Sequence, residues 1–287
     1  MWLFYSLIFA LWTSVGMLIS KRLLVGVKPI VFLAISVAVA LPFMLGTLLI
    51  LGIPTFTPRF FELLFICSFF DTAAAVLYYK ALQISEISLI APISSFNPIF
   101  VLVFATFLLH ENPTPIKIVG IFIVVIGSYL LNISDIKTGL TKPFKKLFSD
   151  RGVQMFLITN FIWGLTPVFQ KRALFETKPV SPLSVPLVEG IFIVLMLLPI
   201  LIKSRSIKSF AIKNSKLLIF FGIMTTFAQF AALSAFALNN VAYASAIFRL
   251  SALFSVILGA VFFNEKHIKE RFLGASVMIA GTILMAF

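Results

Sequence analysis

The chain has 287 residues, of which 61% are hydrophobic and only 11% are charged, and its formal net charge is +13. A soluble domain of this length needs far more charge to cover its surface, so the composition excludes a soluble protein and predicts an integral membrane protein. The basic residues do not indicate nucleic-acid binding, because they lie in short segments between apolar runs and form no aromatic-lined groove.

Ten apolar segments are long enough to cross a bilayer, for which a helix needs about 20 residues. They lie at residues 2–20, 30–51, 60–80, 87–109, 115–132, 152–170, 183–202, 216–238, 241–263 and 268–287. Most are separated by short polar connections. A basic linker, residues 134–151, divides the chain into two five-helix segments, residues 1–133 and 152–287. The sequence therefore predicts an all-α integral membrane protein with ten transmembrane helices.

The two five-helix segments repeat one another. Three residues recur with identical spacing, namely Glu111, Gly120 and Gly127 in the first segment and Glu265, Gly274 and Gly281 in the second. The opening helices both carry a tryptophan and end in a basic pair, as LWTSVGMLISKR and IWGLTPVFQKR. Because each segment has an odd number of helices, the second enters the membrane in the opposite sense. Inverted repeats of this kind are typical of secondary transporters.

Loop charges predict the orientation of the chain. The connections that follow odd-numbered helices carry 17 of the 23 Lys and Arg residues, those on the opposite side carry 5, and Arg249 lies within a predicted helix. The positive-inside rule places the richer side in the cytoplasm. The central linker is thus predicted to be cytoplasmic and both termini external, in a bacterial or archaeal plasma membrane.

The segment from Ala81 to Leu131 reads ALQISEISLIAPISSFNPIFVLVFATFLLHENPTPIKIVGIFIVVIGSYLL and resembles the repeat of the drug/metabolite transporter superfamily, EamA type. That repeat runs from an Ala-Leu pair through a Ser-Pro-like break to a Gly-Glu pair and a glycine-bearing last helix. The segment from Ala237 to Met285 resembles it again, although the Gly-Glu pairs here read His-Glu and Asn-Glu and Ala252 replaces the second proline. The resemblance implies a transporter with a central cavity. It also implies that both termini are cytoplasmic, opposite to the loop charges.

The third and ninth predicted helices each carry a charged residue near the middle, Asp71 and Arg249. Such a residue at the centre of a membrane helix costs roughly 2.5–3.5 kcal/mol, so it faces the protein interior or water and is a candidate functional residue. We expect the two side chains to pair across a cavity, where they bind substrate, couple transport to an ion, or only fix helix register. Tyr78 lies on the same helix face as Asp71 and joins this candidate site.

A stripe of polar and aromatic residues occupies one face of the sixth predicted helix. It consists of Asn160, Trp163, Pro167 and Gln170, and Trp12 is the counterpart of Trp163 in the first repeat. Pro167 frees a backbone carbonyl, a local break of the sort that lines transport sites. The stripe is either part of the transport path or a packing and anchoring surface.

Further polar candidates lie in other helices. Ser95 and Asn97 cluster beside Pro98, which marks either a binding site or a simple kink. Gln229 either lines the path or hydrogen-bonds across helices, and Glu189 is a candidate proton site.

Two further groups of residues have structural explanations. The paired glycines of the fifth and tenth helices should let helices approach closely. Glu111 and Glu265 just precede those same helices, where a carboxylate favours the positive helix start. The only cysteine, Cys67, lies in an apolar run and excludes an intramolecular disulfide.

We interpret the chain as a secondary transporter, with export favoured, that moves a small organic metabolite by alternating access. A fixed Arg and Asp suit an amino acid or a similar zwitterion, since Arg binds a carboxylate bidentately. Coupling to a proton or ion gradient is left open. The partners are this small molecule and the lipid bilayer, and the oligomeric state is also open, with a monomer among the options.

A flippase of a lipid-linked carrier is the alternative, because the resembled superfamily includes flippases. ATP-driven transport is disfavoured by the lack of a GxxxxGK segment. A membrane-embedded enzyme is disfavoured by the lack of HExxH and GxSxG motifs. The sequence predicts no cofactor and no metal ligand set.

Overall fold

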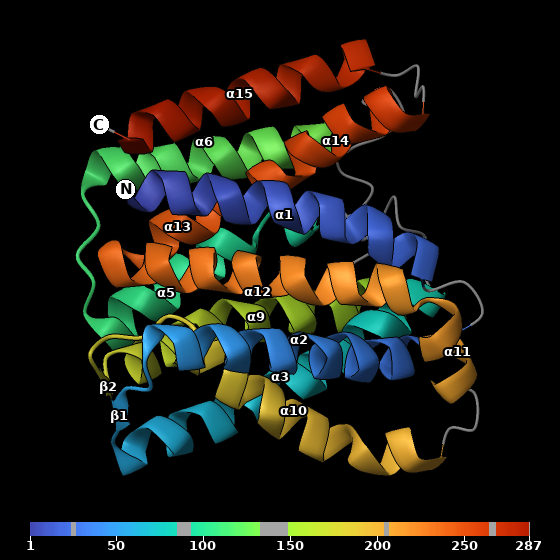
Figure 1. Ribbon diagram of the computed structural model, residues 1–287. Helices are drawn as coiled ribbons and strands as arrows, with labels where there is room; N and C mark the ends of the chain where they lie inside the picture. The colour runs from blue at the N-terminus through green and yellow to red at the C-terminus, as the bar shows by residue number, and fades with distance from the viewer. Residues whose placement is uncertain (24–26, 85–92, 133–148, 204–206, 264–267, 287) are drawn as a thin grey trace.

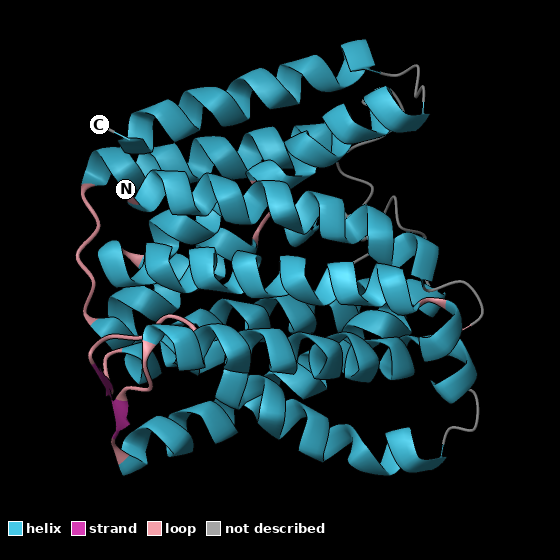
Figure 2. Cartoon of the chain, in the orientation of Figure 1, coloured by secondary structure: helices cyan, strands magenta, loops and turns pink. Residues whose placement is uncertain are grey.

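The computed structural model is a bundle of helices that lie side by side along one common direction (Figure 1). It describes residues 1–23, 27–84, 93–132, 149–203, 207–263 and 268–286, so most of the predicted linker, residues 134–151, lies outside the described part. The helices are α1 (Trp2–Leu23), α2 (Pro29–Leu51), α3 (Pro58–Ile84), α5 (Asn97–Leu109), α6 (Pro115–Asn132), α9 (Arg151–Leu174), α10 (Ser184–Lys203), α11 (Ile207–Lys213), α12 (Ser215–Leu238), α13 (Val241–Phe248), α14 (Leu250–Phe263) and α15 (Ile268–Ala286). Apart from one pair of two-residue strands, β1 (Thr55–Phe56) and β2 (Thr177–Lys178), the regular structure of these residues is helical (Figure 2). The predicted all-α class is confirmed.

The long apolar helices coincide with predicted membrane segments. Within α2, α3, α9, α10 and α12 lie five helices long and apolar enough to cross a membrane, and shorter apolar helices lie in α1, α5, α6, α13–α14 and α15. Large apolar side chains such as Ile50, Phe65 and Phe107 are exposed on the bundle, as expected of a surface that meets lipid. Residues 87–92 of the predicted fourth helix lie outside the described residues, and the count of ten crossings stays a prediction. The short helix α11 was not predicted.

The predicted helix 241–263 is divided into α13 and α14 at Arg249. The Arg249 N–H donates to the carbonyl of Ala246, three residues back, so the helix tightens there into a turn. A similar turn precedes α5, where the Phe96 N–H donates to the carbonyl of Ile93. The two repeats can be aligned by placing Glu111 opposite Glu265. In that alignment the two turns lie within one residue of each other.

The two halves of the chain are interlocked rather than adjacent. Helix α1 of the first half packs against α12, α13 and α14 of the second, and α9 of the second half packs against α3 and α5 of the first. Helices α6 and α15 pack against each other, as do α2 and α10, so exchanging the halves preserves the main packing partners. In Figure 1 α1 leads away from the end that holds the N-terminus and α9 leads back towards the same end, where β2 follows it. These opposite directions agree with inverted repeats.

The pair α6–α15 is held at close range by the repeated glycines. A Cβ atom added at Gly127 would lie 2.6 Å from the Met278 nitrogen and 2.8 Å from the Gly274 carbonyl oxygen. A Cβ atom at Gly281 would lie 2.8 Å from the Gly120 carbonyl oxygen. All of these neighbours are backbone atoms that no rotamer change can move. The predicted packing role of the four glycines is therefore confirmed.

Replacing Gly127 by Ala should lower the free energy of unfolding by about 1–3 kcal/mol, because α6 and α15 must separate to admit the methyl group. The matched control is Gly46→Ala in α2, where an added Cβ meets nothing within 4 Å and Ala is the better helix former. Thermal unfolding of the purified proteins measures both changes. Equal behaviour of the two variants would contradict the close-packing explanation.

Candidate functional site

Arg249 lies in the tightened turn between α13 and α14, and its guanidinium reaches the start of α5, next to the corresponding turn of the first half. Arg249 Nη2 donates to Asn97 Oδ1 at 2.8 Å, and Asn97 Nδ2 donates to the backbone carbonyl of Asn160 at 3.1 Å. The Asn160 side chain in turn donates to the carbonyl of Phe156 at 2.9 Å. We call Arg249, Asn97 and Asn160 the arginine cluster; it joins α13, α5 and α9. Its hydrogen bonds hold a cation with neutral groups only.

The expected ion pair between Arg249 and Asp71 is not formed. In the described part of the chain the one salt bridge joins Glu111 and Lys171, and Arg249 binds the neutral Asn97 instead. Both the Nε atom of Arg249 and the Oδ1 atom of Asp71 are buried without a hydrogen-bond partner. The two charged groups share the bundle interior, but the rotation of α3 turns Asp71 towards α10 rather than towards Arg249.

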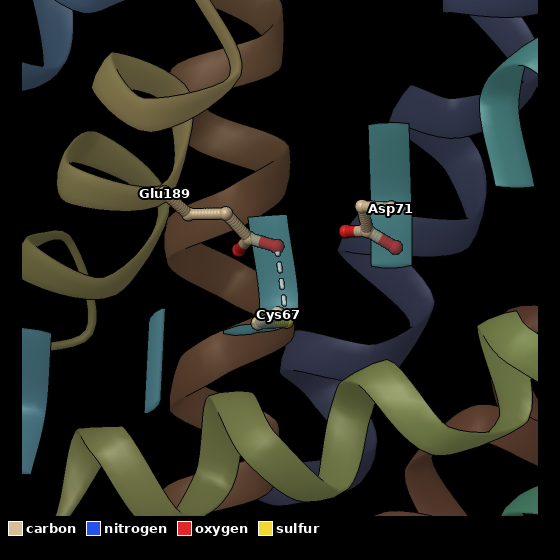
Figure 3. Close-up of side chains that lie close together, drawn as sticks. All are labelled: Cys67, Asp71 and Glu189. Atoms are coloured by element: carbon tan, nitrogen blue, oxygen red, sulfur yellow. Dashed lines mark hydrogen bonds between the residues drawn. The ribbon is translucent and has the colours of Figure 1, made fainter. Parts of the chain in front are cut away.

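Asp71 belongs to a second group, the carboxylate cluster of Cys67, Asp71 and Glu189 (Figure 3). One carboxylate oxygen from each acid and the Cys67 sulfur all lie within 4.8 Å of one another. The Cys67 thiol donates to Glu189 Oε1 at 3.2 Å, and Gln170 Nε2 donates to Glu189 Oε2 at 2.9 Å. Ser68 also donates to the Glu189 backbone carbonyl, at 3.2 Å. Glu189 is thus a buried junction of α3, α9 and α10.

Helix α9 connects the two clusters. Its predicted stripe contributes Asn160 to the arginine cluster and Gln170 to the carboxylate cluster, ten residues or about 15 Å further along the axis. Between them, the Trp163 ring lies 5.3 Å from the Tyr78 ring, measured between centroids. Tyr78 and Trp163 thus bridge α3 and α9, whereas the two carboxylates bridge α3 and α10. The stripe therefore forms a line of polar and aromatic contacts in the interior.

Trp12 and Gln229 lie apart from both clusters. They line a hollow of about 340 Å³ between α1 and α12, together with Thr225 and Phe9. The Phe9 ring lies 4.1 Å from that of Phe248, the residue before Arg249. The hollow therefore approaches the arginine cluster through packed rings, and nearby Ser14 of α1 donates to the Ser251 carbonyl at 2.6 Å.

Ser95 has a structural contact. Its hydroxyl oxygen lies 2.8 Å from that of Ser128 in α6, and the side chain is fully buried. This hydrogen bond fixes the turn before α5 against the glycine-packed pair of α6 and α15. Ser95 thereby orients Asn97, which begins α5.

Two contacts at one end of the bundle were missed or misassigned by the sequence. Glu111 was expected to favour the start of the fifth helix, but its carboxylate accepts a hydrogen bond from the Val241 N–H at 3.0 Å and so caps α13 of the other half. Lys171, the residue after Gln170 in α9, was not a candidate and donates to Glu111 at 2.6 Å. The counterpart Glu265 lies outside the described residues. No local pattern predicts these contacts, because they join the two halves.

Comparisons with known proteins agree with this architecture. The EamA-like transporter family matches residues 1–133 and 150–287. A crystal structure described only as that of a protein superposes with a TM-score of 0.76 at 14% identity, covering 100% of this chain and 98% of the other. That likeness shows the fold alone. No curated protein matches the sequence. Since the family matches nearly the whole chain, this multi-pass membrane protein belongs to the EamA-like transporter family.

Proposed function

We propose that the protein is a secondary transporter, an exporter of a small organic metabolite that carries an anionic group, such as an amino acid. The observation that carries this proposal is the Arg249 guanidinium, placed between the paired helix turns with a neutral partner and a buried, unpartnered Nε. Interruptions of regular helix at equivalent positions of two repeats are typical of transport sites, and these two turns lie at such positions.

Arg249 is suited to hold an anion. Asn97 engages only Nη2 among the donors, and it fixes the plane of the guanidinium. Among the described residues no carboxylate lies within salt-bridge distance of Arg249. A substrate carboxylate could therefore supply both the missing charge and a bidentate contact. The positive starts of α5 and α14, which lie next to Asn97 and Arg249, favour the same charge.

We assign the carboxylate cluster to coupling. Asp71 and Glu189 repel each other when both are charged, and a proton or cation bound between them removes this repulsion. Glu189 is connected through Gln170 and α9 to Asn160 in the arginine cluster. Binding at one cluster is therefore expected to shift α9 and, with it, the residues of the other cluster. Such an arrangement fits transport driven by an ion gradient and needs no cofactor or enzymatic step.

Arg249→Gln should reduce transport about tenfold or more, because it keeps an amide donor towards Asn97 and removes the charge. Arg249→Lys should also be impaired, since an ammonium group cannot make the bidentate contact. The measurement is uptake of a panel of amino acids and other small zwitterions by proteoliposomes, with thermal unfolding to verify folding. Arg151→Gln, the same change at an exposed site, is the control. A folded Arg249→Gln protein with normal uptake would refute the assignment, and lipid flipping without solute uptake would favour the flippase.

Asp71→Asn and Glu189→Gln should abolish solute movement driven by an imposed pH gradient while sparing the exchange of labelled for unlabelled solute. The reason is that exchange needs substrate binding but no net movement of the coupling ion. Glu62→Gln, on an exposed part of the same helix as Asp71, is the matched control. Gradient-driven transport that survives in both variants would exclude coupling at this cluster.

The orientation proposed from the loop charges has its own test. A cysteine placed after Lys146, in the central linker, should react with an impermeant reagent only from the cytoplasmic side. Labelling from outside intact cells would reverse the orientation.

A further inference from the structure

One end of the bundle is closed by contacts that join the two halves of the chain. Strand β1 of the first half pairs with β2 of the second, Thr55 opposite Lys178 and Phe56 opposite Thr177. Thr57 donates to Glu176 Oε2 at 2.7 Å. In Figure 1 these strands lie at the same end as both termini.

The centre of this closure is a pair of charges. Lys171 Nζ donates to Glu111 Oε1 at 2.6 Å, and the two side chains are only 14% and 9% exposed. Lys171 also donates to the Asn239 carbonyl at 2.7 Å, and the Glu111 carboxylate accepts the Val241 N–H. Two further contacts of Tyr243 tie the same helix to the first half: its hydroxyl accepts the Thr114 N–H at 2.9 Å, and Lys117 lies over its ring. The start of α13 is therefore held by charge and hydrogen bonds from the other half.

Helix α13 joins this pair of charges to the proposed substrate site. It is eight residues long, about 12 Å, with Glu111 capping its first N–H and Arg249 in the turn at its end. The residues from Val241 to Ile247 are buried. A short rigid helix with a tightened turn at one end and a pair of charges at the other can tilt as a unit about that turn.

We propose that Glu111 and Lys171, acting on the first turn of α13, form a latch that closes this end of the transport path and opens when Arg249 changes its ligand. The inference rests on the proposed function, since it assigns one of the two gates that alternating access requires. Arg249 is the hinge residue of α13, so a substrate that pulls its guanidinium away from Asn97 tilts the helix and separates Val241 from Glu111.

The surroundings of the latch suit a bond that must open and close. When a purely apolar contact opens, its side chains become exposed to water, which is unfavourable. When an ion pair opens, each charge is hydrated instead. The latch borders a hollow of about 440 Å³, which is also lined by Arg59, Arg172 and Glu176, so water and polar groups are at hand for both partners. A buried ion pair adds little net stability against an apolar packing but fixes one arrangement specifically, which is the property a switch needs.

The test measures access to α13 without any substrate. In a Cys67→Ser background, which keeps a hydroxyl donor towards Glu189, Ser245→Cys places a thiol one helical turn before Arg249 on the same face. Ser245 is 3% exposed, so an impermeant thiol reagent should react slowly. Lys171→Gln should raise the labelling rate about tenfold, as expected for losing one charge-assisted hydrogen bond. Glu111→Gln should raise it less than Glu111→Ala, because the amide oxygen can still cap α13.

Arg172→Gln is the matched control, since it removes the same charge from the neighbouring, exposed position. Val180→Cys lies on the exposed loop at this end of the bundle. Comparing its labelling in intact cells and in inverted vesicles identifies the side of the membrane from which the reagent must be added. Thermal unfolding selects variants that remain folded. The thiol introduced by Ser245→Cys is the probe. The latch is overturned if this thiol is labelled in the folded Lys171→Gln and Glu111→Gln proteins only as fast as in the parent. Faster labelling in these variants, together with no solute transport by the protein of unchanged sequence, keeps the latch and refutes the proposed function instead.

Discussion

A charge inside an apolar bundle has to be satisfied by the protein itself, because lipid offers no hydrogen bonds. Arg249 meets this constraint from a tightened turn of its helix, where it donates to the side-chain oxygen of Asn97, which in turn is fixed by the backbone of Asn160. Three helices from both halves are thereby aligned around one guanidinium. The solution uses neutral partners, so the cation keeps its capacity to attract an anion.

The interlocking of the halves gives this local arrangement its wider effect. Because α1 and α9 each pack into the opposite half, a tilt of one half against the other changes the contacts of both opening helices. The pair α6–α15, held at backbone contact by glycine, cannot deform in the same way and acts as a fixed reference. Motion is therefore expected in the elements with polar breaks, α5 and α13–α14, rather than in the glycine-packed pair.

Helix α9 places the groups of the proposed sites in series. From Asn160 through Trp163 and Gln170 to Lys171 it touches the arginine cluster, the Tyr78 ring, Glu189 and the latch. A single rigid element with contacts to all of these gives a physical basis for coupling between them. Helix α1 is the counterpart of α9 in the first half, and it packs against α12 as α9 packs against α3. The hollow beside Trp12 and Gln229 lies between α1 and α12.

Apolar length determined the helices, and the spacing of Glu111, Gly120 and Gly127 against Glu265, Gly274 and Gly281 determined the repeat. Both depend on local composition, because burying a run of backbone in lipid requires a helix of a set length whatever its neighbours are. The close packing at the glycines could also be predicted from the sequence, because a glycine lacks a side chain whatever residues surround it. Helical periodicity likewise grouped Asn160, Trp163 and Gln170 on one face of α9.

The partners were decided by the tertiary structure. Asp71 was expected to face Arg249, but Arg249 binds Asn97, 152 residues away, and Asp71 lies with Cys67 and Glu189. Glu111 caps a helix 130 residues further on rather than the one it precedes. Periodicity states which residues share a face of one helix but not how that helix is rotated against the others. That rotation is set by the packing of all the helices together, which no local stretch of sequence contains.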